Sequence, residues 1–200
     1  MDTKDRFTLG LELPSDPRWI DIAAKNVRDI LVDHAYCEQK AATSCISLII
    51  QHPERTRIVE MLVPVVAEEW DHFRRVLEEL KKRGYTLGPH RKDEYVEALS
   101  KIVKKGGSRE QQLVEKLLLN ALIEARSCER FRALWKNVED PDLAAFYYEL
   151  MVSEAGHYRM FLDLAMEYMD EEKVMHRWRE WLAAEADIIR EFGMRGDRIH

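Results

Sequence analysis

The stretches EEWDHF, residues 68–73, and SEAGHYRMF, residues 153–161, each place a glutamate three positions before a histidine. The pairs are Glu69 with His72 and Glu154 with His157. Residues three apart lie on the same face of a helix, so each pair presents a carboxylate and an imidazole on one side. A single pair of this kind is common on a solvated helix. Two such pairs in one chain indicate a shared role for these side chains.

The repetition includes a further glutamate. Glu38 precedes Glu69 by 31 residues, and Glu124 precedes Glu154 by 30. The pattern of a glutamate followed by Glu-x-x-His therefore occurs twice with nearly equal spacing. Each acid also lies within a stripe of apolar residues at helical spacing, which predicts that it faces the protein interior.

Buried carboxylates at four such positions require compensating cations, because an unpaired buried charge costs several kcal/mol or more. Four carboxylates and two imidazoles can hold two iron ions and leave positions open for oxygen. The same ligand set is found in ferritin-like di-iron and di-manganese proteins. Buried or surface ion pairs are the alternative interpretation. We predict these metal ligands: Glu38, Glu69, His72, Glu124, Glu154 and His157.

Other residues near these positions receive weaker predictions. Glu129 is a rival to Glu124, but it precedes Glu154 by only 25 residues and lies about 140° around the helix from Glu124. Glu124 is therefore preferred. His34 is expected to be a satisfied core histidine, with a role beside the metal ligands as the alternative. Arg126 and Arg130 are expected to form surface ion pairs, with carboxylate ordering or phosphate binding as alternatives.

The chain contains only 8 glycines, and its apolar residues recur at three and four positions, which predicts an almost entirely helical protein. The expected helices cover about 18–51, 53–83, 92–105, 108–136, 141–168 and 171–192, with Pro53 and Pro141 in first turns and Asp140 as a cap. The four long helices form two hairpins joined by a longer connection at about 84–107. This pattern predicts an all-α fold, a ferritin-like four-helix bundle with one long crossover and additional helices. We expect a single domain over residues 1–200, with the bundle at about 18–168.

Composition sets further limits. Apolar residues make up 46% of the 200, which is typical of a globular protein, and no apolar run approaches the ~20 residues that span a bilayer. The N-terminus lacks the pattern of a secretory signal. Cys37, Cys45 and Cys128 are odd in number and have no CxxC spacing, so we expect reduced thiols and a cytoplasmic protein. The net charge of −6 argues against a protein that is basic overall.

Several stretches resemble one known family, the bacterial tRNA 2-methylthio-N6-isopentenyladenosine hydroxylases. The likeness runs from about residue 9 to about residue 168. It implies a non-haem di-iron monooxygenase that adds one oxygen atom from O2 to the isopentenyl group of the modified adenosine beside the anticodon. The ligand positions of the family match the six residues predicted above. The stretches are LPSDPRW (13–19), DHAYCEQKAA (33–42), EEWDHFRRVLEELKKRGY (68–85), ALIEARSCERF (121–131) and SEAGHYRMFLDLA (153–165).

A tRNA substrate requires positive charge on part of the surface. Residues 81–109 contain nine Lys and Arg against three acids, although a solvated connection explains this excess equally well. The candidate RNA-binding residues are Lys81, Lys82, Arg83, Arg91, Lys92, Lys101, Lys104, Lys105 and Arg109.

The resemblance also implies electron donors outside the chain. A two-iron oxygenase needs two external electrons, and the sequence has no flavin or iron–sulfur motif, so we expect a separate reductase. Two alternatives stay open. One is a ferritin-like protein that handles iron or peroxide, and the other is a di-iron oxygenase of a small apolar substrate.

Overall fold

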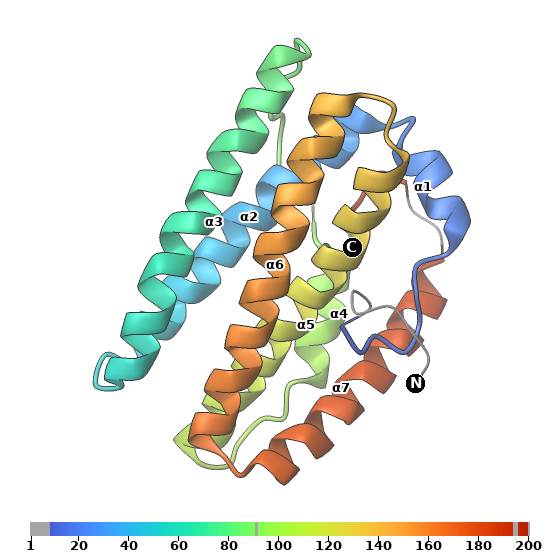
Figure 1. Ribbon diagram of the computed structural model, residues 1–200. Coiled ribbons are helices and arrows are strands. Elements are labelled where there is room, and N and C mark those ends of the chain that lie inside the picture. Colours follow the sequence, from blue (N-terminus) through green and yellow to red (C-terminus); the bar gives the residue numbers. More distant parts are fainter. Residues whose placement is uncertain (1–8, 91, 194–195, 200) are drawn as a thin grey trace. The chain divides into compact units, whose positions relative to one another are not determined.

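The computed structural model describes residues 9–90, 92–193 and 196–199. Within these ranges the chain forms helices and no strands, which confirms the all-α prediction (Figure 1). The structure divides into two compact units. The α2/α3 unit contains residues 21–92 and 196–199, and the α4–α7 unit contains the segment before residue 21 and most of the chain after residue 92. The expectation of one domain stays a prediction. The helices are α1 Pro17–Ala23, α2 Val27–Gln51, α3 Thr56–Lys82, α4 Glu94–Ile102, α5 Arg109–Asn137, α6 Pro141–Tyr168 and α7 Glu171–Phe192.

Helices α2 and α3 form an antiparallel hairpin (Figure 1). Two details of the prediction were wrong here. The helix expected at 18–51 is interrupted, because Asn26 bonds back to the last turn of α1 through its amide nitrogen to the Ile22 carbonyl, 2.9 Å away. Pro53 lies in the turn between the helices instead of in the first turn of α3, since the Arg55 backbone N–H closes that turn on the His52 carbonyl at 3.0 Å.

Helices α5 and α6 form the second antiparallel hairpin (Figure 1). A capping box starts α5: Ser108 accepts a hydrogen bond from the Gln111 backbone, and the Gln111 side chain accepts one from the Ser108 backbone. Asp140 caps α6, and Pro141 occupies its first turn, as predicted. These local signals fix where each helix begins, and hence which residues face the partner helix.

Helix α7 packs against the same unit. It contacts α4, α5 and α6. Trp178 and Trp181 are buried, and the Trp178 ring lies 5.9 Å from the ring of Tyr158 on α6. No helix among the described residues is long and apolar enough to cross a membrane.

Candidate metal centre

The α2/α3 unit brings three of the six predicted ligands together. Glu38 projects from the middle of α2, and Glu69 and His72 project from one face of α3. One ligand atom from each residue lies within 4.8 Å of the others. His72 Nδ1 is 3.6 Å from a Glu38 oxygen and 3.7 Å from a Glu69 oxygen. All three residues are buried, so the hairpin places two carboxylates and an imidazole at one buried point.

A fourth residue supports this cluster. His34 lies one helical turn before Glu38, is fully buried, and its Nε2 is 2.5 Å from Glu38 Oε1. The expectation of a satisfied core histidine is correct, but its partner is a predicted ligand. A hydrogen bond of this kind orients a carboxylate and leaves its other oxygen for a metal.

The α4–α7 unit carries the matching cluster. Glu124 projects from α5, and Glu154 and His157 project from α6, with one ligand atom of each within 4.8 Å of the others. His157 Nδ1 lies 2.9 Å from Glu154 Oε2, and all three residues are buried. The structure therefore contains the same three residue types twice, once in each unit.

This donor set fits iron. Carboxylate oxygens and imidazole nitrogens are the ligands of non-haem iron sites, and each cluster supplies two carboxylates and one imidazole. Two carboxylates crowded into a buried site repel one another, so a cation of high charge would stabilise each cluster. The atoms are also close enough to share a metal ion without a rearrangement of the backbone.

Glu129 has different partners from Glu124. Its carboxylate accepts hydrogen bonds from the Ser15 backbone N–H at 2.8 Å, the Ser15 hydroxyl at 2.6 Å and Arg126 Nη1 at 2.8 Å. Among the described residues, no group of potential metal ligands includes Glu129. The pKa of Glu129 is lowered, since burial, which would raise it, is outweighed by Arg126, Arg130 and Ser15. These contacts support the choice of Glu124.

Arg126 is the centre of a buried ionic network that the sequence did not predict. Its side chain is fully buried and bonds both oxygens of the equally buried Glu185, at 2.8 and 2.9 Å. The Tyr95 hydroxyl donates to the same carboxylate at 3.1 Å. The expectation of surface ion pairs at Arg126 and Arg130 was wrong, because α7 and the segment before α1 cover this face of α5. Only the acid at Glu129, three residues from Arg126, was a local signal of the network.

Cys128 lies one turn beyond Glu124 and points to the partner helix. Its thiol donates to the Met151 carbonyl on α6 at 3.3 Å. Burial, followed by the charge of Glu154, raises the pKa of the Cys128 thiol to about 12. A neutral thiol at this position packs α5 against α6 and adds no negative charge beside the two carboxylates.

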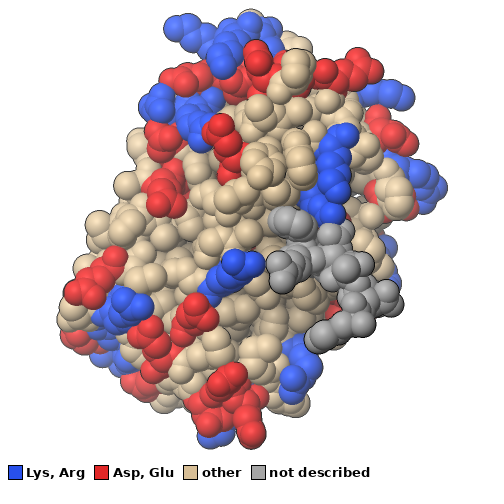
Figure 2. Space-filling view, in the orientation of Figure 1, with Lys and Arg blue, Asp and Glu red and all other residues tan. Residues whose placement is uncertain are grey.

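The candidate RNA-binding residues are exposed or half-buried, except Arg91, which lies outside the described residues. On the face shown in Figure 2, basic and acidic side chains are interspersed. Several of the candidates have acidic partners: Lys82 and Arg83 both contact Glu79, at 2.5 Å. Lys104 contacts Glu180 at 2.8 Å. In the folded protein, acidic side chains therefore neutralise part of the positive charge of residues 81–109.

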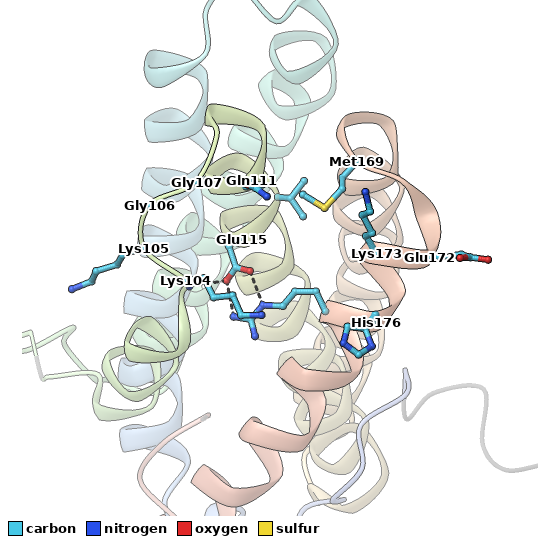
Figure 3. Close-up of a pocket in the computed structure, with 12 residues that line it drawn as sticks. Lys104, Lys105, Gly106, Gly107, Gln111, Glu115, Met169, Glu172, Lys173 and His176 are labelled. Atoms are coloured by element: carbon cyan, nitrogen blue, oxygen red, sulfur yellow. Dashed lines mark hydrogen bonds and ion pairs between the residues drawn. The ribbon is translucent and has the colours of Figure 1, made fainter.

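Lys104 and Lys105 line a cavity of about 600 Å³ in the α4–α7 unit. Figure 3 shows Lys105 extending away from this cavity, while the Glu115 carboxylate lies near its centre. That carboxylate accepts from the Lys104 backbone N–H at 3.0 Å and from Arg177 at 2.6 and 2.8 Å. Lys104 and Arg177 on this wall are thus already paired with acids of the protein.

Comparison with known proteins decides the family. The tRNA-(MS[2]IO[6]A)-hydroxylase (MiaE) family matches residues 4–200. The chain belongs to the MiaE family. A MiaE-family relative from Pseudomonas putida, tRNA 2-(methylsulfanyl)-N(6)-isopentenyladenosine(37) hydroxylase, is 36% identical over 90% of this chain and 86% of its own length. The hydroxylase of the same name from Salmonella typhimurium is 35% identical over 68% of this chain and 49% of its own length.

A solved structure extends the comparison to a protein with a different named activity. Protein 43 with aldehyde deformylating oxygenase activity, from Synechococcus, is 30% identical. It covers 98% of this chain and 96% of its own, with a TM-score of 0.90. This likeness confirms the predicted ferritin-like fold class. It also places a MiaE-family chain close in structure to an oxygenase of a different named activity.

Proposed function

We propose that this protein hydroxylates the isopentenyl group of 2-methylthio-N6-isopentenyladenosine in tRNA, beside the anticodon, with O2 as co-substrate. The carrying observation is the buried cluster of two glutamates and a histidine, present once in each unit of a MiaE-family chain. A storage protein for iron or peroxide is not favoured by these relatives. Because its substrate is tRNA, the proposed enzyme works in the cytoplasm.

The two clusters together supply the ligands of two iron ions. Glu38, Glu69 and His72 provide one set, and the α5/α6 cluster provides the other. When bound, iron ions in such a site activate O2, and a separate reductase supplies the electrons. His34 keeps the Glu38 carboxylate oriented through its 2.5 Å contact. In each cluster, two carboxylates would balance the charge of one ferrous ion, as burial of the cluster requires.

Apolar residues around the ligands serve the substrate. Phe73 follows His72 on α3, and Phe161 lies one turn after His157 on α6, and both are buried. An apolar side chain beside each cluster suits a branched hydrocarbon such as the isopentenyl group. It also excludes water, which protects the oxidant from side reactions.

The basic residues of 81–109 hold the tRNA in this proposal. Lys101 and Lys105 are exposed and carry the positive charge that phosphates need. Lys82, Arg83 and Lys104 would first have to exchange an acidic partner of the protein for a phosphate. We therefore assign the first pair the larger share of phosphate binding.

Mass spectrometry of nucleosides tests the function. tRNA carrying the isopentenylated base is incubated with protein, iron, a chemical reductant and O2, and its nucleosides are then separated and weighed. We expect the modified adenosine to gain one oxygen atom. The variants Glu154→Ala and His72→Ala should each lose at least one of about two irons per chain and the activity. Unchanged adenosine with an iron-loaded protein would refute the substrate, and full iron content in both variants would refute the ligand assignment.

The Synechococcus likeness favours one second candidate. A chain 30% identical to a protein with aldehyde deformylating oxygenase activity could act on an aldehyde in place of RNA. The same reaction with an aliphatic aldehyde replacing tRNA separates the candidates. We expect the protein to consume the aldehyde much more slowly than it hydroxylates tRNA. If it consumes the aldehyde faster, the aldehyde oxygenase becomes the better assignment.

A further inference from the structure

A second cavity lies in the α4–α7 unit, outside the metal clusters. Its volume is about 460 Å³. It is formed by the segment before α1, the start of α1, one residue of α5 and the end of α7. Its lining includes three arginines and one aspartate, Arg18, Arg130, Arg190 and Asp16, so its charged residues carry a net charge of +2.

Arg130 is the buried base of this cavity. The residue is only 6% exposed, and its guanidinium lies 4.0 Å from the centroid of the Trp19 ring. Its contact with the neighbouring acid is long, with Nε 3.9 Å from Glu129 Oε2. A hydrogen bond between these atoms would need a distance of about 3 Å. The described residues therefore hold the guanidinium over an aromatic ring and place no acceptor within hydrogen-bond distance of its Nε or Nη1.

Glu129 cannot easily move closer, because its oxygens are already occupied by Ser15 and Arg126. Within the described part of the chain, Arg130 Nε and Nη1 are buried and have no hydrogen-bond partner. The two buried arginines and the acids Glu129 and Glu185 balance in charge. What Arg130 lacks is an acceptor, and a buried donor without one costs about 1–3 kcal/mol, or more for a charged group.

Burial also lowers the pKa of Arg130 to about 10, more than the neighbouring Glu129 raises it. The guanidinium stays charged at neutral pH. A bound anion would reverse this effect, since it favours the charged form.

The rim of the cavity adds two arginines that are free to adapt. The Arg18 side chain is 71% exposed and pairs with Asp16, and the Arg190 side chain is 59% exposed and pairs with Asp187. Surface pairs of this kind contribute little, about 0–1 kcal/mol, so either arginine can exchange its partner at small cost.

We propose that this cavity is a phosphate-binding site, with Arg130 as its buried anchor and Arg18 and Arg190 as its rim. Two neighbouring N–H groups of one guanidinium match two oxygens of a phosphate, which makes arginine a specific phosphate ligand. The phosphate belongs either to the tRNA backbone, which rests on the proposed function, or to a small phosphate-bearing molecule. The cavity of Lys104 and Arg177 is a weaker candidate, because acids of the protein already occupy those bases.

Calorimetric titration of the full-length protein with inorganic phosphate, at constant ionic strength, tests the site. We expect saturable binding. Arg130→Met keeps the apolar stem against Trp19 and removes the donors, and it should weaken binding by about tenfold or more, the scale of a lost charge-assisted hydrogen bond. The double variant Arg18→Gln/Arg190→Gln changes exposed residues only and should weaken binding about twofold to fivefold. Arg179→Gln, which removes an exposed arginine elsewhere on α7, is the matched control and should bind as the parent does.

A second titration with a tRNA anticodon stem-loop at several salt concentrations identifies the source of the phosphate. A backbone phosphate predicts weaker binding by Arg130→Met, and a salt slope smaller by about one unit. Loss of inorganic phosphate binding with an unchanged RNA slope assigns the site to a small phosphate-bearing molecule. The proposal is overturned if the parent takes up no phosphate. It is equally overturned if Arg130→Met and the rim variant both bind phosphate as well as Arg179→Gln does. Neither titration depends on O2 or on hydroxylation. A protein that fails to hydroxylate tRNA would therefore contradict the proposed function without contradicting the phosphate site.

Discussion

Replacing Arg126 by methionine should destabilise the protein by about 3–5 kcal/mol, the usual cost of stranding one partner of a buried ion pair. The guanidinium is fully buried and donates to Glu185 at 2.8 and 2.9 Å, to Glu129 at 2.8 Å and to the Leu13 carbonyl at 2.9 Å. Methionine fills much of the same volume but donates nothing. Among the described residues, the hydrogen-bond donor that remains to Glu185 is then the Tyr95 hydroxyl.

The size of the loss should depend on pH. Burial raises the pKa of Glu185, while Arg126 and Tyr95 oppose that rise. Without Arg126 the pKa rises further. A carboxyl whose pKa is higher in the folded than in the unfolded protein penalises folding as pH rises above the unfolded value of 4.5. The Arg126→Met variant should therefore lose less stability at pH 5 than at pH 8.

Urea unfolding at both pH values measures these effects. The control Arg179→Met removes an exposed arginine and should change the free energy of unfolding by less than about 0.5 kcal/mol. The double variant Arg126→Met/Glu185→Gln, which removes both charges, should recover part of the loss. A loss below about 1 kcal/mol for Arg126→Met, or one that does not vary with pH, would show that Glu185 finds another partner and would refute the reasoning.

Three further predictions concern the other sites. Glu124→Gln should lose iron while Glu129→Gln keeps its iron and loses stability, as measured by metal analysis and urea unfolding; the reverse would assign the ligand to Glu129. At pH 8 a thiol of pKa about 12 is almost entirely protonated, so Cys128 should react with a disulfide reagent far more slowly than the half-buried Cys37. Peptide mapping of the labelled protein measures both rates, and equal rates would contradict the burial of Cys128. Replacing Lys101, Lys104 and Lys105 together by alanine should weaken tRNA binding and flatten its salt dependence without changing the iron content. If this variant binds tRNA as the parent does, these lysines do not contact tRNA.

The grouping of the predicted ligands could be predicted from sequence because its signals are local. Glu69 and His72 lie three residues apart on α3, and helix geometry alone places them on one face. The spacing between Glu38 and Glu69 then follows from two long helices and a short turn. Asp140 and Pro141 likewise mark the start of α6 without any tertiary information.

The buried ionic network could not be predicted in this way. Arg126 is 59 residues from Glu185, and Glu185 is 90 residues from Tyr95. No periodicity connects such positions, since their pairing depends on how α7 packs against α4 and α5. The break before α2 was missed for a different reason. Asn26 interrupts an otherwise helical pattern because its side chain bonds the nearby Ile22 carbonyl. Asparagine can compete with helix formation in this way wherever it occurs, so the sequence alone does not show where a helix breaks.

The position of Glu124 depends on this network as well as on its own helix. Glu124 and Glu129 lie about 140° apart around α5, so the rotation of the helix decides which acid faces α6. Ser15 and Arg126 hold Glu129 on the opposite side, and Cys128 bonds the Met151 carbonyl of α6. A turn of α5 that moved Glu124 away from Glu154 would break all of these contacts together. The buried charges therefore do more than balance one another: they fix the rotation of α5 at which Glu124 lies beside Glu154 and His157 of α6.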